Sequence, residues 1–466
     1  MISILIAATA MGASVTLTPA DSISGLTGSL GPGDVITFSA GTYELDSGLT
    51  WEGLGEEGNP IKFVAEGEVI LQWSASGQLA RLNNSTFVEI RGITFRGTQE
   101  HYDANNYGGL RIGDSSNVIV EDCTFDLIGG TGIFLSGNTS EITLRGNEIK
   151  NSRDDGIYAG CYDAACWTEN TLIDGNLIHD IENGDGIEFG NGSKASSITN
   201  NVVYNIGDDG IQTRSTEYGD PNIIEGNVVW GATGGLVLTG SATVRNNIIH
   251  TIDGPAIYTE NERDTLEKLV ISFNTIYNTT SWGIDIRQWA GLDGMVFANN
   301  TITNSTGLSI RAVAGTVDEA NYFAGNVVTG LVDSQYLDPL LGHYSAGAGH
   351  LDYTDVEFWN FYPSTESTLI NKADLSAEAR PPTLDFNGTA RDATGLDVGA
   401  YEWSCFENPG WELREGFKSL DVESCHSEEL SSGGCCGKSD DTEASDAAAA
   451  FMLPLVLLGW RRRRDS

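Results

Sequence analysis

Three aspartates in the middle of this chain are the residues best suited to acid–base or metal chemistry. Asp155, Asp185 and Asp209 each precede a glycine, at intervals of 30 and 24 residues, and Asp154 and Asp208 adjoin two of them. If these intervals are neighbouring turns of one repeating structure, the carboxylates would lie roughly 5 Å apart and repel one another. At least one pKa would then be raised, or a cation would bridge the group.

Two chemistries fit such a cluster. A carboxyl with a raised pKa beside an ionised one forms the acid–base pair of glycoside hydrolysis. A bridging calcium ion would suit a polyuronate lyase or a structural site, and calcium is the one cofactor that we expect. Its predicted ligands are Asp154, Asp155, Asp185, Asp208 and Asp209. The alternative is that aspartate before glycine only caps a tight turn.

A lyase also needs a base for the proton beside a uronate carboxylate and a cation that neutralises this carboxylate. Arg214, Arg287 and Arg311 are candidates for the cation, and Tyr258 for donation to the leaving group. The alternative for these arginines is ion pairing with neighbouring acids. The predicted catalytic residues are Asp155, Asp185, Asp209, Arg214, Tyr258 and Arg287.

A repeated phrase indicates which elements position these residues. An asparagine followed by residues that end apolar recurs at positions 147, 176, 201, 227, 247, 274, 300 and 326, with Cys123 in the preceding slot, at steps of 20 to 29 residues. A glycine column runs in parallel at 109, 132, 156, 186, 210, 235, 283 and 307, with Ala256 in one slot. Short Ile- and Val-rich runs between them predict strands without helices, hence a β-solenoid with an internal asparagine ladder.

Alternation after each glycine predicts an outward-facing column suited to an extended polymer. It contains Arg111, Phe134, Tyr158, Glu188, Gln212, Val237, Tyr258, Asp285 and Ser309, and a second set two residues further on contains Arg214, Glu260, Arg287 and Arg311. The predicted substrate-binding residues are Arg111, Tyr158, Glu188, Gln212, Asp285 and Arg311. Another outward column, Lys150, His179, Tyr204, Trp230, His250 and Tyr277, would stack on sugar rings or pack under loops.

On these phrases, and on residues 32–43, 385–391 and 396–402, the chain resembles right-handed parallel β-helix proteins of the pectin-lyase-like group over residues 20–404. The resemblance implies an all-β, single-stranded right-handed parallel β-helix (solenoid) of about 10–12 coils with capped ends. This fold carries lyases, hydrolases, epimerases and non-catalytic adhesins. Gly207–Ile211 is similar to a polygalacturonase phrase, but the Gly-His-Gly and Arg-Ile-Lys phrases of that family are missing.

The predicted organisation is a signal peptide at 1–13, an N-terminal cap and first coils at 14–75, repeats at 76–335 and a C-terminal cap at 336–404. A helix carrying Ile23, Leu26 and Leu30 would close one end, and the aromatic-rich 336–362 segment would fold over the other. The alternative for the first residues is a short buried strand. Disulfides Cys161–Cys166 and Cys405–Cys425 suit an exported protein, and Cys123 is expected in the core.

Residues 405–446 form an acidic, cysteine-containing linker, and 447–466 combine an apolar run with an arginine cluster. This end is similar to sorting tags of Gram-negative surface proteins, notably of myxobacteria, which implies transient membrane contact and a secreted or cell-surface location. A retained anchor helix is the alternative. The net charge of −40 excludes nucleic acid and disfavours polyanions unless calcium intervenes.

The resulting hypothesis is an exported, monomeric β-helix protein that acts on polysaccharide. We expect it to cleave a polyuronate or related glycan by lyase or hydrolase chemistry. The alternative is a non-catalytic glycan-binding or adhesive surface protein. The two differ in whether a base, an acid and a cationic group converge on one bound atom.

Overall fold

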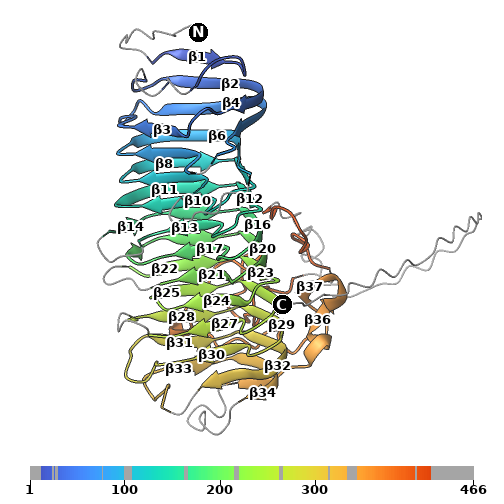
Figure 1. Ribbon diagram of the computed structural model, residues 1–466. Helices are drawn as coiled ribbons and strands as arrows, with labels where there is room; N and C mark the ends of the chain where they lie inside the picture. Colours follow the sequence, from blue (N-terminus) through green and yellow to red (C-terminus); the bar gives the residue numbers. More distant parts are fainter. Residues whose placement is uncertain are drawn as a thin grey trace, which may run out of the picture. The chain divides into compact units, whose positions relative to one another are not determined.

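The structure is a computed structural model. It describes residues 12–23, 26, 30–75, 77–98, 108–161, 166–214, 220–261, 266–312, 315–332, 344–404 and 407–420. The chain separates into two compact units, residues 1–423 and 424–466, and all described residues lie in the first. Parallel strands dominate this unit and wind as a right-handed solenoid of about ten turns. The predicted fold class is therefore confirmed (Figure 1).

Each full turn contributes one strand to each of three parallel sheets. The first sheet follows the glycine column and carries the candidate site. Its strands are β3 (Leu49–Glu52), β5 (Ala80–Asn83), β7 (Leu110–Gly113), β10 (Ile133–Ser136), β13 (Ile157–Ala159), β17 (Ile187–Phe189), β21 (Asp209–Thr213), β24 (Gly234–Leu238), β27 (Ile257–Thr259), β30 (Ile284–Ile286) and the end of β32 (Thr301–Ala312).

The second sheet follows in each turn. It contains β1 (Ser14–Leu17), the first parts of β2 (Val35–Glu44), β4 (Ile61–Gln72) and β6 (Thr86–Arg96), then β8 (Ser116–Glu121), β11 (Thr139–Arg145), β15 (Leu172–Asp174), β19 (Ser197–Thr199), β22 (Asn222–Glu225), β25 (Ala242–Arg245), β28 (Leu269–Ser272), β31 (Met295–Ala298) and β33 (Tyr322–Ala324). Two short strands, β14 (Thr168–Glu169) and β18 (Ser193–Lys194), continue the ladder from the start of β11.

The third sheet closes each turn. It contains the last parts of β2, β4 and β6, then β9 (Thr124–Asp126), β12 (Glu148–Lys150), β16 (Leu177–Ile181), β20 (Val202–Ile206), β23 (Val228–Trp230), β26 (Ile248–Ile252), β29 (Thr275–Thr279), the start of β32, β34 (Asn326–Val332) and β35 (Tyr344–Ala346). Outside the solenoid lie η3 (Gly349–Asp352), β36 (Tyr353–Asp355), η4 (Val356–Phe358), β37 (Asn360–Pro363) and η5 (Ala377–Ala379).

Alternating burial along the strands fills the space between the sheets. In β7, for example, Leu110 and Ile112 are fully buried while Arg111 points outward. Side chains of successive turns stack in the interior, as Phe95 and Phe125 do with ring centroids 4.9 Å apart. Cys123 is buried in this core, as predicted. The period-2 pattern thus fixes which residues leave the solenoid surface.

The asparagine ladder lies at the corner between the second and third sheets and confirms the predicted column. In Asn201, for instance, the backbone N–H and the side-chain amide both donate to Asn227 Oδ1 at 2.9 Å. The same pattern joins consecutive asparagines from Asn147 to Asn326. The ladder ends where the backbone N–H of Cys123 donates to Asn147 Oδ1 at 3.0 Å. These buried amides satisfy each other and hold the turns in register.

The segment after the last turn runs back along the third sheet. We name residues 344–420 the C-terminal strap. Residues 344–346 pair with β34, and Tyr353 hydrogen-bonds to Thr301 Oγ1 at 3.0 Å. Further on, Arg391 Nη2 donates to Asn246 Oδ1 at 2.9 Å, and Lys418 Nζ donates to the Gly226 carbonyl at 2.8 Å. Figure 1 shows this orange and red segment beside the green and yellow turns.

For residues 344–362 this arrangement differs from the expectation that the aromatic-rich segment 336–362 folds over the C-terminal end, and residues 336–343 lie outside the described part of the chain. Residues 344–346 extend the last turn, and the apolar side chains that follow contact the flank of the third sheet. The packed region also extends past residue 404. Trp411 and Leu413, placed in the predicted linker, are buried against the same sheet.

Several predictions concern residues that the structure describes in part. At the N-terminus Ile23 and Leu26 are buried and Leu30 packs against the core, while residues 24, 25 and 27–29 of the expected helix lie outside the described residues. The segments 1–11 and 421–466 also lie outside them, as do Cys405 and Cys425, so the signal peptide, the second disulfide and the sorting tag remain predictions. In the part of the chain that is described, no helix is long and apolar enough to cross a membrane.

Candidate functional site

The outer face of the first sheet carries the predicted column of side chains, with one correction. In register it runs Thr50, Arg81, Arg111, Phe134, Tyr158, Glu188, Gln212, Val237, Tyr258, Asp285 and Arg311. The last position was expected to be Ser309. Because Ile310 pairs with Ile284, Ser309 takes the glycine slot that was predicted for Gly307. The predicted register relied on Gly307-Leu308, and Leu308 lies two residues before Ile310, the residue that pairs with Ile284. The predicted outward position was therefore two residues too early.

The three aspartates before the glycines form a ladder of their own. The backbone N–H of Asp185 donates to Asp155 Oδ1 at 2.9 Å, and that of Asp209 donates to Asp185 Oδ1 at 3.0 Å. Each of the first two carboxylates therefore uses one oxygen to hold the next turn. The turn-capping alternative is correct in that these carboxylates accept hydrogen bonds from the backbone. It is wrong about the donor, because the N–H belongs to the following turn of the solenoid. The second oxygen of each remains for other contacts.

A compact carboxylate group results. Acceptor oxygens of Asp155, Asp185 and Glu188 all lie within 4.8 Å of one another, and all three residues are buried. A second triplet, formed by Asp185, Asp208 and Asp209, meets the same distance criterion but is more exposed. We name Asp155, Asp185, Glu188 and Asp209 the carboxylate cluster. Glu188 was predicted to bind substrate and was missed as a ligand candidate.

Burial shifts the acid–base properties of the cluster. Desolvation, reinforced by the charges of Asp155 and Asp209, raises the pKa of Asp185 to about 8. Desolvation also raises the pKa of Glu188 to about 7, and Arg214 opposes this rise. The pKa of Asp155 is raised well above its ordinary value by burial and by Glu188. Near neutral pH the cluster therefore holds protons and ionised carboxylates together.

The outer carboxylates are less perturbed. Desolvation and the charge of Asp208 raise the pKa of Asp209 to about 6. Burial raises the pKa of Asp154, whose Oδ2 accepts a hydrogen bond of 3.4 Å from Thr131 Oγ1. Asp208 is exposed. The pKa of these carboxyls therefore increases with burial, so the carboxyls with the highest pKa are the most deeply buried ones.

One cation contacts the cluster directly. Arg214 Nε donates to Glu188 Oε1 at 2.6 Å and to Gln212 Oε1 at 2.8 Å. The side chain of Gln212 also donates to Asp209 Oδ2 at 3.4 Å. Tyr158, predicted to bind substrate, is only 1% exposed and packs on Phe134 with ring centroids 5.1 Å apart. Carboxylates and one cation thus contact one another at this cluster.

The remaining predicted catalytic residues form a separate group. Asp285 is fully buried, and its Oδ2 accepts from Arg287 Nε at 3.1 Å and Arg311 Nη1 at 2.7 Å. Arg287 Nη1 donates to Tyr258 Oη at 3.1 Å, and Tyr258 also hydrogen-bonds to Glu260. Burial and that bond raise the pKa of Tyr258. The alternative of ion pairing with neighbouring acids therefore holds for Arg287 and Arg311, and also for Arg214, which pairs with Glu188.

The structure does not bring this second group to the carboxylate cluster. The turn that carries Val237 separates Gln212 from Tyr258 in the column. The two positions are two rungs apart, or roughly 10 Å. The predicted catalytic set therefore divides into Asp155, Asp185, Asp209 and Arg214 on one side and Tyr258 and Arg287 on the other. No single reacting atom could touch both parts.

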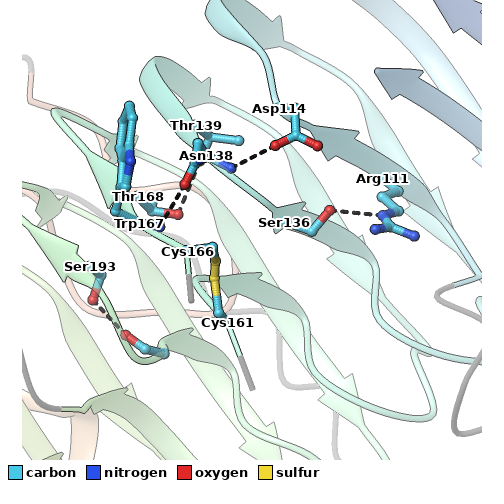
Figure 2. Close-up of a disulfide and its surroundings, with 11 residues drawn as sticks. Arg111, Asp114, Ser136, Asn138, Thr139, Cys161, Cys166, Trp167, Thr168 and Ser193 are labelled. Atoms are coloured by element: carbon cyan, nitrogen blue, oxygen red, sulfur yellow. Dashed lines mark hydrogen bonds between the residues drawn. A yellow bond between two sulfur atoms is a disulfide. The ribbon is translucent and has the colours of Figure 1, made fainter. Parts of the chain in front are cut away.

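Arg111 lies on the other side of the cluster, three rungs before Glu188. Its Nε donates to Ser136 Oγ at 2.8 Å, and its guanidinium carbon is 5.7 Å from the Phe134 ring centroid. Figure 2 shows this bond near the Cys161–Cys166 disulfide, whose formation was predicted. The next residue of the column, Arg81, was missed because no Gly-Ile phrase precedes it.

The predicted aromatic column lies on the third sheet, but its rings stack on one another. His179, Tyr204, Trp230 and His250 follow one another with ring centroids 4.9, 4.6 and 5.4 Å apart. Trp359 of the strap covers both Trp230 and His250, and these two residues are buried. The loop-packing alternative is thus correct for the middle of the column, which is closed to sugar rings.

The geometry defines a parallel β-helix with a carboxylate cluster on its first sheet. A family model described as "right handed beta helix region" matches residues 70–218 and 168–306, which together span just over half of the chain. The chain belongs to this right-handed β-helix family. No curated protein sequence matches it significantly.

Solved structures resemble the fold at low sequence identity. Pectate lyase Pel9A has a TM-score of 0.52 and 14% identity, and the match covers 85% of this chain and 97% of that one. The GH136 lacto-N-biosidase from Eubacterium ramulus has a TM-score of 0.51 and 12% identity, with 68% of each chain covered. At these identities the likeness concerns the fold.

Proposed function

We propose that this chain cleaves a polysaccharide, a polyuronate or a related glycan, at the carboxylate cluster. The observation that carries the proposal is the position of Glu188, which lies on the outward column between buried Asp185 and the Arg214 guanidinium. Glycan-cleaving proteins among the structural neighbours, a pectate lyase and a lacto-N-biosidase, support the class of substrate.

Two carboxyls with pKa values near neutrality give the site an acid and a base at once. Asp185, with a pKa of about 8, holds its proton at pH 7, and Glu188, with a pKa of about 7, is half ionised. In a hydrolase the protonated carboxyl would protonate the glycosidic oxygen while the other assists attack. In a lyase the ionised carboxyl would remove the proton beside a uronate carboxylate, and Arg214 would neutralise that carboxylate.

Calcium is the cation that we propose for the cluster. It binds oxygen ligands at roughly 2.3–2.6 Å, so two ligands of one ion lie at most about 5 Å apart. The oxygens of Asp155, Asp185 and Glu188 fall within 4.8 Å and meet this limit. In the lyase case a bound calcium would supply positive charge that holds the acids ionised and attracts an acidic substrate, whereas the hydrolase case uses the cluster without the ion. Asp154, Asp208 and Asp209 would add outer ligands.

The cellular setting is part of the same proposal. The Cys161–Cys166 disulfide supports an oxidising compartment, which agrees with export to the cell surface or beyond. We propose a monomer whose C-terminal tag contacts the membrane during sorting. The alternative function is glycan binding without catalysis. It is favoured by the mutual pairing of Asp285, Arg287 and Arg311, which leaves that group resembling a structural network.

The test is incubation of the purified chain with alginate, pectate and neutral glycans, with and without calcium. An unsaturated, ultraviolet-absorbing product establishes a lyase, and new reducing ends without it establish a hydrolase. Binding without product in the whole panel favours the alternative. A calcium-dependent rise in Tm that is lost in Asp185→Asn would support the ion. Equal calcium shifts in both proteins would contradict it.

A further inference from the structure

Two arginines face each other on the first sheet, outside the carboxylate cluster. Arg81 on β5 and Arg111 on β7 are direct partners in the parallel register. Both are partly exposed on the outer face, beside buried Ala80, Leu82, Leu110 and Ile112. Like charges directly opposite one another destabilise a sheet. A chain with 65 acidic and 25 basic residues has ample carboxylates to neutralise such a pair.

Other arginines on the strands are neutralised in this way. Carboxylates lie within 4.0 Å of each member of a set on described strands, namely Arg91, Arg96, Arg145, Arg245 and Arg311. Arg81 differs from them, since among the described residues no carboxylate lies within ion-pair distance of it. Within the described part of the chain, the charge of Arg81 is therefore not neutralised by an ion pair.

The surroundings of the pair suit a sugar acid. Two residues further on, Asn83 and Ser136 stand on the outer face, with Gly113 between them in the register. A Cβ at Gly113 would lie 2.8 Å from Asn83 Oδ1 and 3.3 Å from Ser136 Oγ, so only glycine leaves this space. Figure 2 shows Arg111 directed to Ser136 and the nearby Asp114 bonded to the Asn138 N–H.

The pair is aligned with the carboxylate cluster. The column continues from Arg81 and Arg111 through Phe134 and Tyr158 to Glu188. At roughly 4.8 Å per rung, Arg111 lies about 14 Å and Arg81 about 19 Å from Glu188 along the axis. A polysaccharide lying along the solenoid would thus reach both sites at once, with several sugars between them.

We infer that Arg81 and Arg111 form a subsite for the carboxylate or sulfate group of an acidic polysaccharide, several sugars away from the carboxylate cluster. This inference rests on the proposed function for the direction of the polymer. A guanidinium binds oxyanions through two parallel N–H donors, and two guanidiniums in register match successive acceptor groups along one chain. On a chain with a net charge of −40, two adjacent guanidiniums would attract an acidic polymer to this part of the sheet.

The experiment is titration calorimetry of the full chain with defined-length oligogalacturonate, oligomannuronate and sulfated galactan oligosaccharides. A neutral glucan of similar length serves as the uncharged probe. We expect wild type to bind an acidic probe and Arg81→Gln/Arg111→Gln to bind it about tenfold more weakly, with a smaller salt dependence. The preferred probe distinguishes a carboxylate from a sulfate.

Arg145→Gln is the matched control, because Arg145 stands on the second sheet and pairs with Asp174. It should leave the affinity unchanged. Arg81→Gln alone should not lower Tm, since it removes repulsion rather than a contact. Equal affinity of wild type and the double variant for acidic probes, or no binding of any of them by wild type, overturns the inference. Binding that depends on the two arginines without any cleavage would retain it and contradict the proposed function.

Discussion

Arg214 donates its Nε–H to Glu188 Oε1 at 2.6 Å across two neighbouring turns of the solenoid. Glu188 is buried, and Arg214 is the one cation that opposes the rise of its pKa among the causes acting on it. This pair therefore decides how much of Glu188 is ionised near neutral pH.

Arg214→Gln should raise the pKa of Glu188 above its wild-type value of about 7, because the stabilising positive charge is lost. If ionised Glu188 is the base, the pH–rate profile should shift to higher pH and the rate at pH 7 should fall about tenfold or more. Arg214→Lys, which keeps the positive charge, should restore part of the wild-type activity at pH 7. The rate of product formation as a function of pH measures the shift. An Arg214→Gln profile identical to that of wild type would rule out this role of Arg214.

Stability should depend on pH through Asp185. Its pKa is about 8 in the folded chain and about 3.9 in an unfolded one. The folded state therefore binds the proton more tightly. The stability that this provides is complete below pH ~4 and is lost as pH rises toward 8. Without added calcium, Tm should fall over this window.

Asp185→Asn should flatten that dependence, since the amide keeps the Oδ1 acceptor for the Asp209 N–H and carries no titrating proton. The difference between the two proteins should be on the order of a few kcal/mol across the window. Thermal unfolding at stepped pH measures it, with Asp180→Asn, an exposed carboxylate on the third sheet, as control. Parallel curves for wild type and Asp185→Asn would contradict the assignment.

The asparagine ladder should be sensitive at its centre. Asn227→Ala removes the acceptor of two Asn201 donors and the amide bonded to Asn247 Oδ1. Leaving buried donors unpaired costs about 1–3 kcal/mol each, so unfolding should require clearly less denaturant. Asn183→Ala, at an exposed asparagine whose amide donates to the Arg153 carbonyl, should change little. Similar denaturation midpoints for both variants would show that the ladder adds no stability.

The strap should depend on Arg391. Its Nη2 donates to the Gly399 carbonyl at 2.8 Å and its Nη1 to Glu402 at 3.2 Å, in a buried site over the Phe273 ring. Arg391→Ala leaves buried acids unpaired, at a cost of about 3–5 kcal/mol. Limited proteolysis should then cut residues 344–420 faster than in wild type or in Arg414→Ala, at an exposed arginine of the same segment. Equal cleavage rates would contradict the locking role.

The solenoid could be predicted because its determinants are local and periodic. Each asparagine must reach the next, so the period of the sequence is the period of the backbone. The prediction failed at Gly307, where a Gly-Leu phrase lies two residues ahead of the register set by Ile310. A short sequence motif does not determine the strand register where one strand runs without a break from the third sheet into the first, as β32 does.

The site was predictable in part. The alternation of inward and outward side chains along a strand predicted that Glu188 faces outward. Asp155 and Asp185 both precede a glycine, and this shared position predicted that they lie on neighbouring turns. The strap was not foreseen, because its contacts with Trp230 and His250 join segments more than a hundred residues apart without any repeat. The separation of Tyr258 from the cluster could be read from the predicted column, in which Val237 lies between Gln212 and Tyr258, but the predicted catalytic set did not take that turn into account.

The central claim is that Glu188 and its neighbours cleave a glycan. The most direct measurement compares product formation by wild type and Glu188→Gln on whichever polysaccharide of the panel wild type degrades. We predict a loss of about 10²–10⁴-fold in kcat with an unchanged Tm at acid pH, where Glu188 is protonated and the amide resembles it. Glu188→Gln with wild-type turnover, or wild type inert toward every glycan with and without calcium, would contradict the account.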